Sequence, residues 1–259
     1  MIKYIFVFLF SLSAFANITV FPTAAHFDVR KSVATVSVKN SSNAVTTYSI
    51  EAIFYVVGPD GKYQEVADTS KQENSLVKLM RFSPRKITLR PSEEQVVRIM
   101  VKKDRRLKAG DYRAHVRFSP IDVKDPNFVE KKNKPGMYLD ARVAVSIPGL
   151  LRLEPVEKSL VIDEFKVLKT PEGPRYSVSL TKGEGYFPYG EFRVTGTDKD
   201  GNALNLALVK GVQSFNKTMT FNFPFTDSDN LKKAVKATLL YVETFNGAEE
   251  KIAEKSIAL

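Results

Sequence analysis

The stretch "YLDARVAVSIP", from Tyr138 to Pro148, decides the fold class of this chain. Its apolar side chains recur at every second position, which is the pattern of a β-strand with one hydrophobic face. A loop rich in lysine and proline precedes the stretch. The hydrophobic face either packs in the protein's own core or is available to another molecule. Its members are Leu139, Ala141, Val143, Val145 and Ile147.

Most other segments also have the pattern of short strands separated by turns. Examples are "SVATVSVKN" from Ser32, "GDYRAHVRFSP" from Gly110, "RYSVSLTKG" from Arg175 and "ALNLALVKG" from Ala203. The strands follow one another at intervals of about ten residues, and they form two successive series. This pattern predicts an all-β protein made of two β-sandwiches. The polar, proline-bearing "RLEPVEKS" is the best boundary between them, near residue 155.

One segment allows a second interpretation. In "NLKKAVKATLLYVE", from Asn230, Leu231, Val235 and Leu239 recur at helical spacing. The ending "TLLYVET" is rich in residues that favour strands, so we expect a strand here.

The first 16 residues have the pattern of a secretory signal peptide. Lys3 is followed by an apolar run and then by Ala14-Phe15-Ala16, a small-x-small cleavage site. The apolar run is shorter than the roughly 20 residues that a spanning helix needs, so a membrane anchor is the weaker interpretation. We therefore expect residues 1–16 to be removed and the mature chain to lie outside the cytoplasm, without membrane insertion.

Composition excludes several kinds of site. The chain has no cysteine, so disulfides and cysteine metal sites are excluded. Its formal net charge is +10, but the basic residues are spread along the chain, so we expect this charge to serve an acidic protein partner or solubility alone rather than nucleic acid. The two histidines, His26 and His115, have no neighbours at metal-ligand spacing, and no nucleophile elbow or phosphate loop is present. We expect no enzyme activity, cofactor or metal.

The order of the motifs resembles the PapD-like periplasmic chaperones of pilus assembly, in their divergent branch. The motifs are Leu-x-Pro-x-x-x-Gln-x-x-Arg from Leu89 to Arg98, Asp-Tyr-Arg from Asp111, and the Ile-Pro ending at Pro148. The resemblance covers essentially the whole mature chain. It implies two immunoglobulin-like β-sandwiches in an L-shaped arrangement, at residues 17–154 and 155–259.

The resemblance also implies a function, donor-strand complementation. A periplasmic chaperone of this family lends a strand to a pilus or fimbria-like subunit that lacks one, which prevents aggregation until assembly. The residues expected to enter the subunit are Leu139, Ala141, Val143 and Val145. An outer-membrane usher is a further candidate partner, and a self-capping homodimer is a candidate resting state.

The chain departs from the family at the anchor for the subunit's terminal carboxylate. Ala24 stands where the family has an arginine, and Pro148 stands where it has a lysine. The residues that could replace these cations are Arg152, Arg142, Arg30 and His26.

Two other interpretations remain open. The chain could be a structural immunoglobulin-like component of a pilus or surface, or a PapD-like protein that no longer handles subunits. A fibre subunit should lack a strand or carry a free donor extension, whereas both halves of this sequence have patterns for seven strands.

Overall fold

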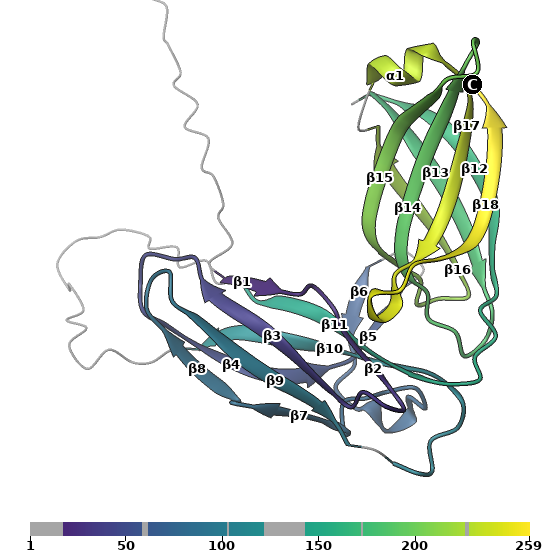
Figure 1. Ribbon diagram of the computed structural model, residues 1–259. Coiled ribbons are helices and arrows are strands. Elements are labelled where there is room, and N and C mark those ends of the chain that lie inside the picture. The colour runs from purple at the N-terminus through teal and green to yellow at the C-terminus, as the bar shows by residue number, and fades with distance from the viewer. Residues whose placement is uncertain (1–17, 59–61, 103, 122–142, 172, 226–227) are drawn as a thin grey trace, which may run out of the picture.

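The chain folds into two β-sandwiches that meet at a corner and form an L (Figure 1). This confirms the expected all-β class and two-sandwich architecture. Each sandwich has a separate hydrophobic core. The predicted signal peptide and the segment that contains Leu139, Ala141 and Arg142 lie outside the described residues. The computed structural model describes residues 18–58, 62–102, 104–121, 143–171, 173–225 and 228–259.

The first sandwich consists of two packed sheets and one small hairpin. The four-stranded sheet has the order β1 (Ile18–Phe21), β3 (Val33–Asn40), β9 (Glu94–Val101), β7 (Met80–Ser83). The five-stranded sheet has the order β2 (Ala25–Asp28), β11 (Val145–Leu153), β10 (Gly110–Ile121), β4 (Thr46–Ile53), β8 (Lys86–Leu89). The hairpin of β5 (Tyr55–Val57) and β6 (Tyr63–Glu65), with the 3-10 helix η1 (Thr69–Lys71), lies between β4 and β7 in the chain.

The alternation of side chains along β9 shows how the sequence selects the buried face. Val97, Ile99 and Val101 lie in the core, whereas Val96 and Met100 are exposed. Successive side chains of a strand point to opposite faces, so a shift by one residue would expose the whole apolar set. This alternation fixes the register of β9 against β3 and β7.

The first strand is divided between the two sheets. β1 pairs with β3 in one sheet, and β2 pairs in parallel with β11 in the other. Pro22 lies at the change and has no backbone N–H to donate to a strand ladder. The split strand therefore closes one side of the sandwich while covering only a short part of β11.

The second sandwich contains seven strands. One sheet has the order β12 (Leu160–Thr170), β13 (Gly173–Lys182), β16 (Thr218–Pro224). The other has the order β15 (Ala203–Gln213), β14 (Tyr189–Asp198), β17 (Ala234–Glu243), β18 (Glu250–Ala258). Two short helices, α1 (Ser228–Lys233) and η2 (Phe245–Gly247), lie before and after β17.

The ambiguous segment from Asn230 contains both kinds of structure. The expected strand is present from Ala234 as β17, but Asn230 to Lys233 belong to α1. Lys232 pairs with Asp229 three residues earlier, a contact that one helical turn allows. The strand prediction was therefore wrong for the first four residues.

No helix in the described parts of the chain is long and apolar enough to cross a membrane.

We predict that the inward side chains of β9 carry the stability of the first sandwich. Replacing Ile99, which is fully buried, with alanine should lower the free energy of unfolding by about 2–5 kcal/mol, because it leaves a cavity. Urea unfolding followed by circular dichroism measures this change. Val96→Ala, on the exposed face of the same strand, is the matched control. An equal loss in both variants would contradict the observed register.

Candidate functional site: the edge of β11 and the junction between the sandwiches

One side of β11 is only partly covered by a neighbouring strand. β10 pairs with β11 along its whole length, from Val145 to Leu153. On the other side, β2 pairs only with Gly149 to Arg152. Within the described residues, no strand pairs with this outer side from Val145 to Pro148. Unpaired backbone groups on such an edge can pair with a strand from another chain.

The alternating side chains pass from the protein's core to solvent toward the start of this strand. Ile147 is buried, and Val145 is partly buried against the core of the first sandwich. Val143, two residues before β11, is 45% exposed. The hydrophobic face of the opening stretch is thus internal at Ile147 and external at Val143. Its earlier members, Leu139 and Ala141, lie outside the described residues.

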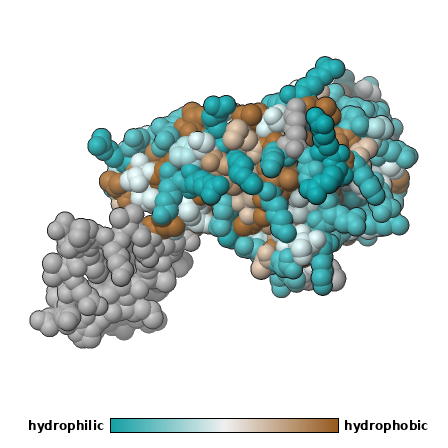
Figure 2. All heavy atoms as spheres, turned by 90° about the horizontal axis from the view of Figure 1, so that it is seen from below, coloured by the Kyte–Doolittle hydropathy of each residue, from teal (hydrophilic) through white to brown (hydrophobic). Residues whose placement is uncertain are grey.

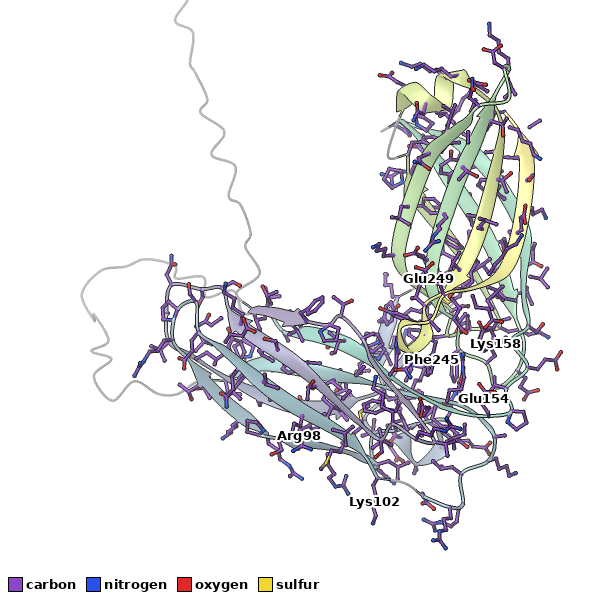
Figure 3. The ribbon with its side chains drawn as sticks, in the orientation of Figure 1. Arg98, Lys102, Glu154, Lys158, Phe245 and Glu249 are labelled. Atoms are coloured by element: carbon purple, nitrogen blue, oxygen red, sulfur yellow. The ribbon has the colours of Figure 1, made fainter. Side chains whose placement is uncertain are left out.

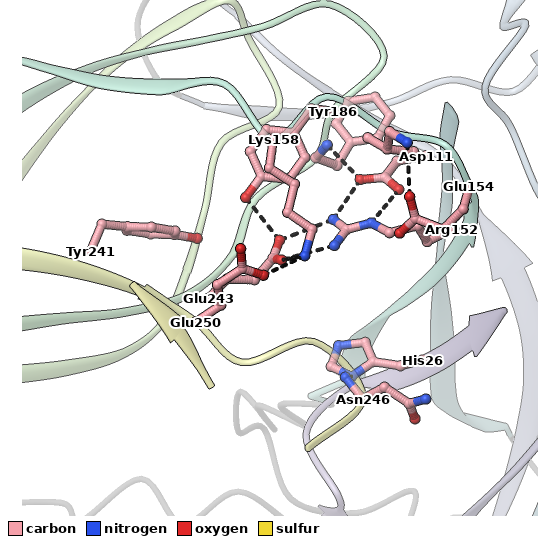
Figure 4. A network of polar contacts seen from close by, with 12 residues as sticks. His26, Asp111, Arg152, Glu154, Lys158, Tyr186, Tyr241, Glu243, Asn246 and Glu250 are labelled. Carbon is pink, nitrogen blue, oxygen red and sulfur yellow. Dashed lines mark hydrogen bonds and ion pairs between the residues drawn. The ribbon is translucent and has the colours of Figure 1, made fainter. Parts of the chain in front are cut away.

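Arg152, at the other end of β11, links the two sandwiches through a buried ion cluster (Figure 4). Its Nε and Nη2 donate to the two oxygens of Asp111 on β10, both at 2.8 Å. Its Nη1 and Nη2 donate to Glu243 of β17, at 2.8 and 3.0 Å. Both pairs are bidentate, which is the strongest geometry for a guanidinium and a carboxylate.

Other groups complete the hydrogen bonds of the two carboxylates. Tyr186 donates its hydroxyl hydrogen to Glu243 at 2.8 Å, and the backbone N–H of Phe187 donates to Asp111 at 2.9 Å. Lys158 lies between Glu243 and Glu250, at 3.2 and 2.6 Å. Buried charges are stable only when they are paired in this way.

The ion cluster determines the charge states of its members. Burial alone would raise the pKa of Glu243, but the hydrogen bonds and charge of Arg152 outweigh it and hold this pKa below its usual value. Burial would likewise lower the pKa of Arg152, whereas Asp111 and Glu243 raise it. Arg152 and Glu243 are therefore ionised at neutral pH, whereas burial raises the pKa of Asp111 against the effect of Arg152.

Arg113 makes a second link across the junction. Its side chain is buried, and Nη1 donates to the carbonyl oxygen of Tyr55 at 2.7 Å. The guanidinium lies over the ring of Phe54 from the first sandwich, at 4.1 Å, and over Phe215 from the second, at 4.3 Å. Such cation–π contacts are strong when they are shielded from water. Burial lowers the pKa of Arg113 to about 10.

The loop after β17 docks on β2 at a third point. The ring of His26 stacks on Phe245, with ring centroids 4.8 Å apart, and its Nδ1 accepts a hydrogen bond from the backbone N–H of Asn246. The side chain of Asn246 contacts Lys31 and Asp28. Figure 3 shows Phe245 at the corner together with Lys158 and Glu154, whereas Arg98 lies away from the corner on the first sandwich.

The four candidate anchor residues lie in different environments. Arg152 uses its guanidinium for Asp111 and Glu243, so it belongs to the junction. Arg30 is exposed and borders a cavity between the sandwiches that Arg152 and Phe245 also line. His26 is uncharged at neutral pH, because burial, Lys31 and Arg152 lower its pKa to about 4. Arg142 lies outside the described residues.

The two positions where the family would have a cation lie in different parts of the first sandwich: Ala24 lies between β1 and β2, and Pro148 lies within β11. Ala24 borders a groove at the corner together with His26, Lys31 and Tyr189. Pro148 is buried in β11 opposite His115 of β10.

Arg152 was named from the sequence as a candidate anchor, but Asp111, Arg113 and Glu243 were not predicted to be site residues. Asp111 and Arg113 both belong to the Asp-Tyr-Arg motif, and their spacing of two places them on one face of β10. This spacing was the available signal. Glu243 gives no local signal, because it meets Arg152 only through contacts 91 positions apart in sequence.

The site has the geometry of a rigid corner beside an open strand edge. Within the described residues, no group of three or more histidine, cysteine, aspartate or glutamate side chains could hold a metal ion. The features that the fold provides are an unpaired strand edge, an apolar side chain exposed beside it, and a fixed angle between two sandwiches.

Comparisons with known proteins return structures of pilus-assembly chaperones. No family model and no curated protein matches the chain. A solved structure of the CsuC–CsuE chaperone–tip adhesion subunit complex, from the archaic chaperone-usher Csu pili of Acinetobacter baumannii, is 12% identical, with a TM-score of 0.45. The match covers 92% of this chain and 97% of that chain.

Two further structures have the same level of similarity. The CupB2 chaperone of Pseudomonas aeruginosa is 14% identical, with a TM-score of 0.45, and the match covers 93% of this chain and 100% of that chain. The DraB chaperone of E. coli is 10% identical, with a TM-score of 0.46, over 93% and 95% of the two chains. These proteins are of the kind that the sequence motifs resemble.

We predict that removing the guanidinium of Arg152 weakens the junction strongly. Arg152→Met leaves Asp111 and Glu243 buried without their partner, which should cost about 3–5 kcal/mol of unfolding free energy. The measurement is the first unfolding transition in urea. Arg106→Met, which removes an exposed pair with Asp104, should leave this transition unchanged. Equal transitions in the two variants would show that the ion cluster does not hold the sandwiches together.

Proposed function

We propose that this protein is a periplasmic chaperone that binds and caps pilus or fimbria-like subunits by donor-strand complementation. In this role it prevents their aggregation and delivers them for assembly, without enzyme activity. The observation that carries the proposal is the uncovered edge of β11 from Val145 to Pro148, together with exposed Val143 just before it.

The edge supplies what an incomplete sandwich lacks. A sandwich that is short of one strand exposes a hydrophobic groove and unpaired backbone groups, which promote aggregation. A strand added from another chain supplies the backbone hydrogen bonds, and its alternate side chains fill the groove. Leu139, Ala141, Val143 and Val145 are the side chains proposed to enter the subunit.

Val145 has a position intermediate between donor and core residue. It packs in part against the first sandwich's own core, whereas Val143 has no such role among the described core contacts. We infer that the lent segment begins before β11 and that its hydrophobic face becomes internal at Ile147, which is buried. The same strand would then be anchored at its end and available at its start.

Among the described residues, the face of the protein that is seen from below shows no continuous hydrophobic surface. Hydrophobic residues lie there in small groups between hydrophilic ones (Figure 2). Exposed single apolar residues are normal on a soluble protein. The strand edge therefore stands out because of its unpaired backbone and not because the protein is hydrophobic in general.

Among the candidate anchors, Arg30 fits a carboxylate best within the described residues. Its guanidinium is exposed at the corner cavity, whereas Arg152 is already held by two carboxylates and His26 is neutral. An exposed guanidinium can bind a carboxylate with two hydrogen bonds. Arg142, which precedes the lent edge in sequence, is the second candidate.

The proposed partners and location follow from the same function. The expected signal peptide, residues 1–16, would direct the chain to the periplasm. There an outer-membrane usher would receive the subunit, and a second copy of the chain could cover the edge while no subunit is bound.

The structural alternative, a pilus or surface component, has less support. A fibre subunit would lack a strand, whereas the second sandwich has seven strands of its own. A PapD-like protein that no longer binds subunits would keep the fold but would not form a complex.

We predict that a charge at the edge abolishes subunit binding and leaves the fold intact. Val143→Asp, combined with Leu139→Asp, would place carboxylates in the subunit's groove, so capture of an exported subunit should fall by at least about tenfold. Co-purification from periplasm with mass spectrometry measures the capture, and circular dichroism checks the fold.

Val161→Asp is the matched control, because Val161 is 53% exposed on β12 of the second sandwich. This variant should capture the subunit as the unchanged chain does. Unfolding of the double variant would show that the two side chains belong to the protein's own core. A folded double variant that still captures the subunit would also contradict the donor assignment.

A further inference from the structure

Both histidines of the chain lie where the two sandwiches meet. His26 on β2 stacks on Phe245, which follows β17 of the second sandwich. His115 on β10 lies edge-on to Phe215, from the loop between β15 and β16, with ring centroids 5.7 Å apart. These two histidines are the only histidines of the sequence, and their side chains ordinarily titrate near pH 6.5. Both therefore lie at the junction between the sandwiches.

The hydrogen bond of His26 requires the neutral ring. Its Nδ1 accepts a hydrogen from the backbone N–H of Asn246, at 2.9 Å. A proton on Nδ1 would turn this acceptor into a donor and place two N–H groups against each other. In the neutral ring the hydrogen therefore lies on Nε2, which is buried and has no hydrogen-bond partner among the described residues.

The charges around His26 also disfavour protonation. Lys31 and Arg152 lie near the ring, and Glu243, which opposes their effect, is already paired with Arg152. Asp28 lies on the far side of Asn246 and accepts from its amide. Burial, followed by Lys31 and Arg152, lowers the pKa of His26 to about 4.

His115 lies in a pocket of aromatic rings without a carboxylate partner. Tyr55 and Tyr63 of the β5–β6 hairpin are edge-on to its ring, at 5.0 and 6.4 Å. Within the part of the chain that the structure describes, the buried Nδ1 of His115 has no hydrogen-bond partner. Burial and then Arg113, on the same face of β10, lower the pKa of His115 to about 4.

We propose that the junction between the sandwiches is an acid-sensitive contact, which loosens when His26 and His115 take up protons. The proposal does not depend on the function proposed above. It rests on the position of both rings between the domains, on the acceptor role of Nδ1 in His26, and on the cations that already occupy the junction.

The direction and size of the effect follow from linkage. A histidine freed by opening regains its usual pKa of 6.5, whereas in the closed junction the pKa is about 4. The contact therefore has its full strength above the usual pKa and weakens as the pH falls toward the lowered one. Between pH 7 and pH 5, His26, which Phe245 and Asn246 of the second sandwich cover, should raise the opening constant by up to about 20-fold. His115 should contribute less, because Tyr55, Tyr63 and Arg113 of its own sandwich stay beside it on opening.

Hydrogen exchange of one backbone amide tests the proposal in the mature chain. The N–H of Asp111 donates to the carbonyl oxygen of Gly185 across the junction, at 2.8 Å, so its exchange reports opening. We compare exchange at about pH 7 and pH 5, corrected for the intrinsic rate, in the unchanged chain and in His26→Phe, His115→Phe and the double variant. The amide of Val178, in the core of the second sandwich, shows whether that sandwich stays folded.

The unchanged chain should show the largest increase in opening. His115→Phe, which keeps His26, should show an increase of up to about 20-fold, His26→Phe a smaller one, and the double variant almost none. An Asp111 amide that is equally protected at both pH values in the unchanged chain would overturn the proposal. So would the same increase in the double variant, because it would assign the effect to carboxylates such as Asp111, whose pKa burial raises.

A second measurement covers variants that do not fold. Titration of the two imidazoles by NMR in the unchanged chain should give two pKa values well below 6.5. Values near 6.5 with the junction still closed would overturn the proposal.

Discussion

The structure depends on one arginine that is shared by two carboxylates, one from each sandwich. Arg152 holds Asp111 of the first domain and Glu243 of the second in a buried cluster. A hydrophobic contact would tolerate sliding, but two bidentate pairs fix direction as well as distance. Because Arg152 belongs to β11, the strand with the uncovered edge is itself tied to the second sandwich. The orientation of that edge is thus determined at its own far end.

Contacts on both sides of the ion cluster support this constraint. Arg113 lies between rings of both domains, and the loop around Asn246 covers His26. Arg152, Asp111 and Glu243 each have a hydrogen-bond partner from the opposite domain, which explains how these charged residues can be buried there.

The sequence was sufficient to predict the all-β class and the two-sandwich architecture, because alternation along segments such as Val33 to Asn40 is a local property. The short helix before β17 was missed because its last four residues begin a segment whose remainder has the pattern of a strand. Arg152 was one of four candidates for binding a partner's carboxylate. Its observed partners, Asp111 on β10 and Glu243 on β17, lie far from it in sequence, and such pairings leave no periodic signal. Nothing local in the sequence indicates that His115 is buried at the junction, where its Nδ1 has no hydrogen-bond partner among the described residues.

The divided first strand determines how many residues of β11 are left without a neighbouring strand on their outer side. β2 begins at Ala25 and occupies the outer side of β11 only from Gly149 onward. In the proposed function, the point at which the chain crosses between the sheets would therefore set how much of the outer side of β11 is open to a subunit. If the crossing at Pro22 lay two residues nearer the C-terminus, β2 would cover less of β11 and a longer strand could pair there. If it lay two residues nearer the N-terminus, the open part of β11 would be shorter. Chains with this fold could in this way differ in the length of strand that pairs with β11, without any change in the residues that contact it.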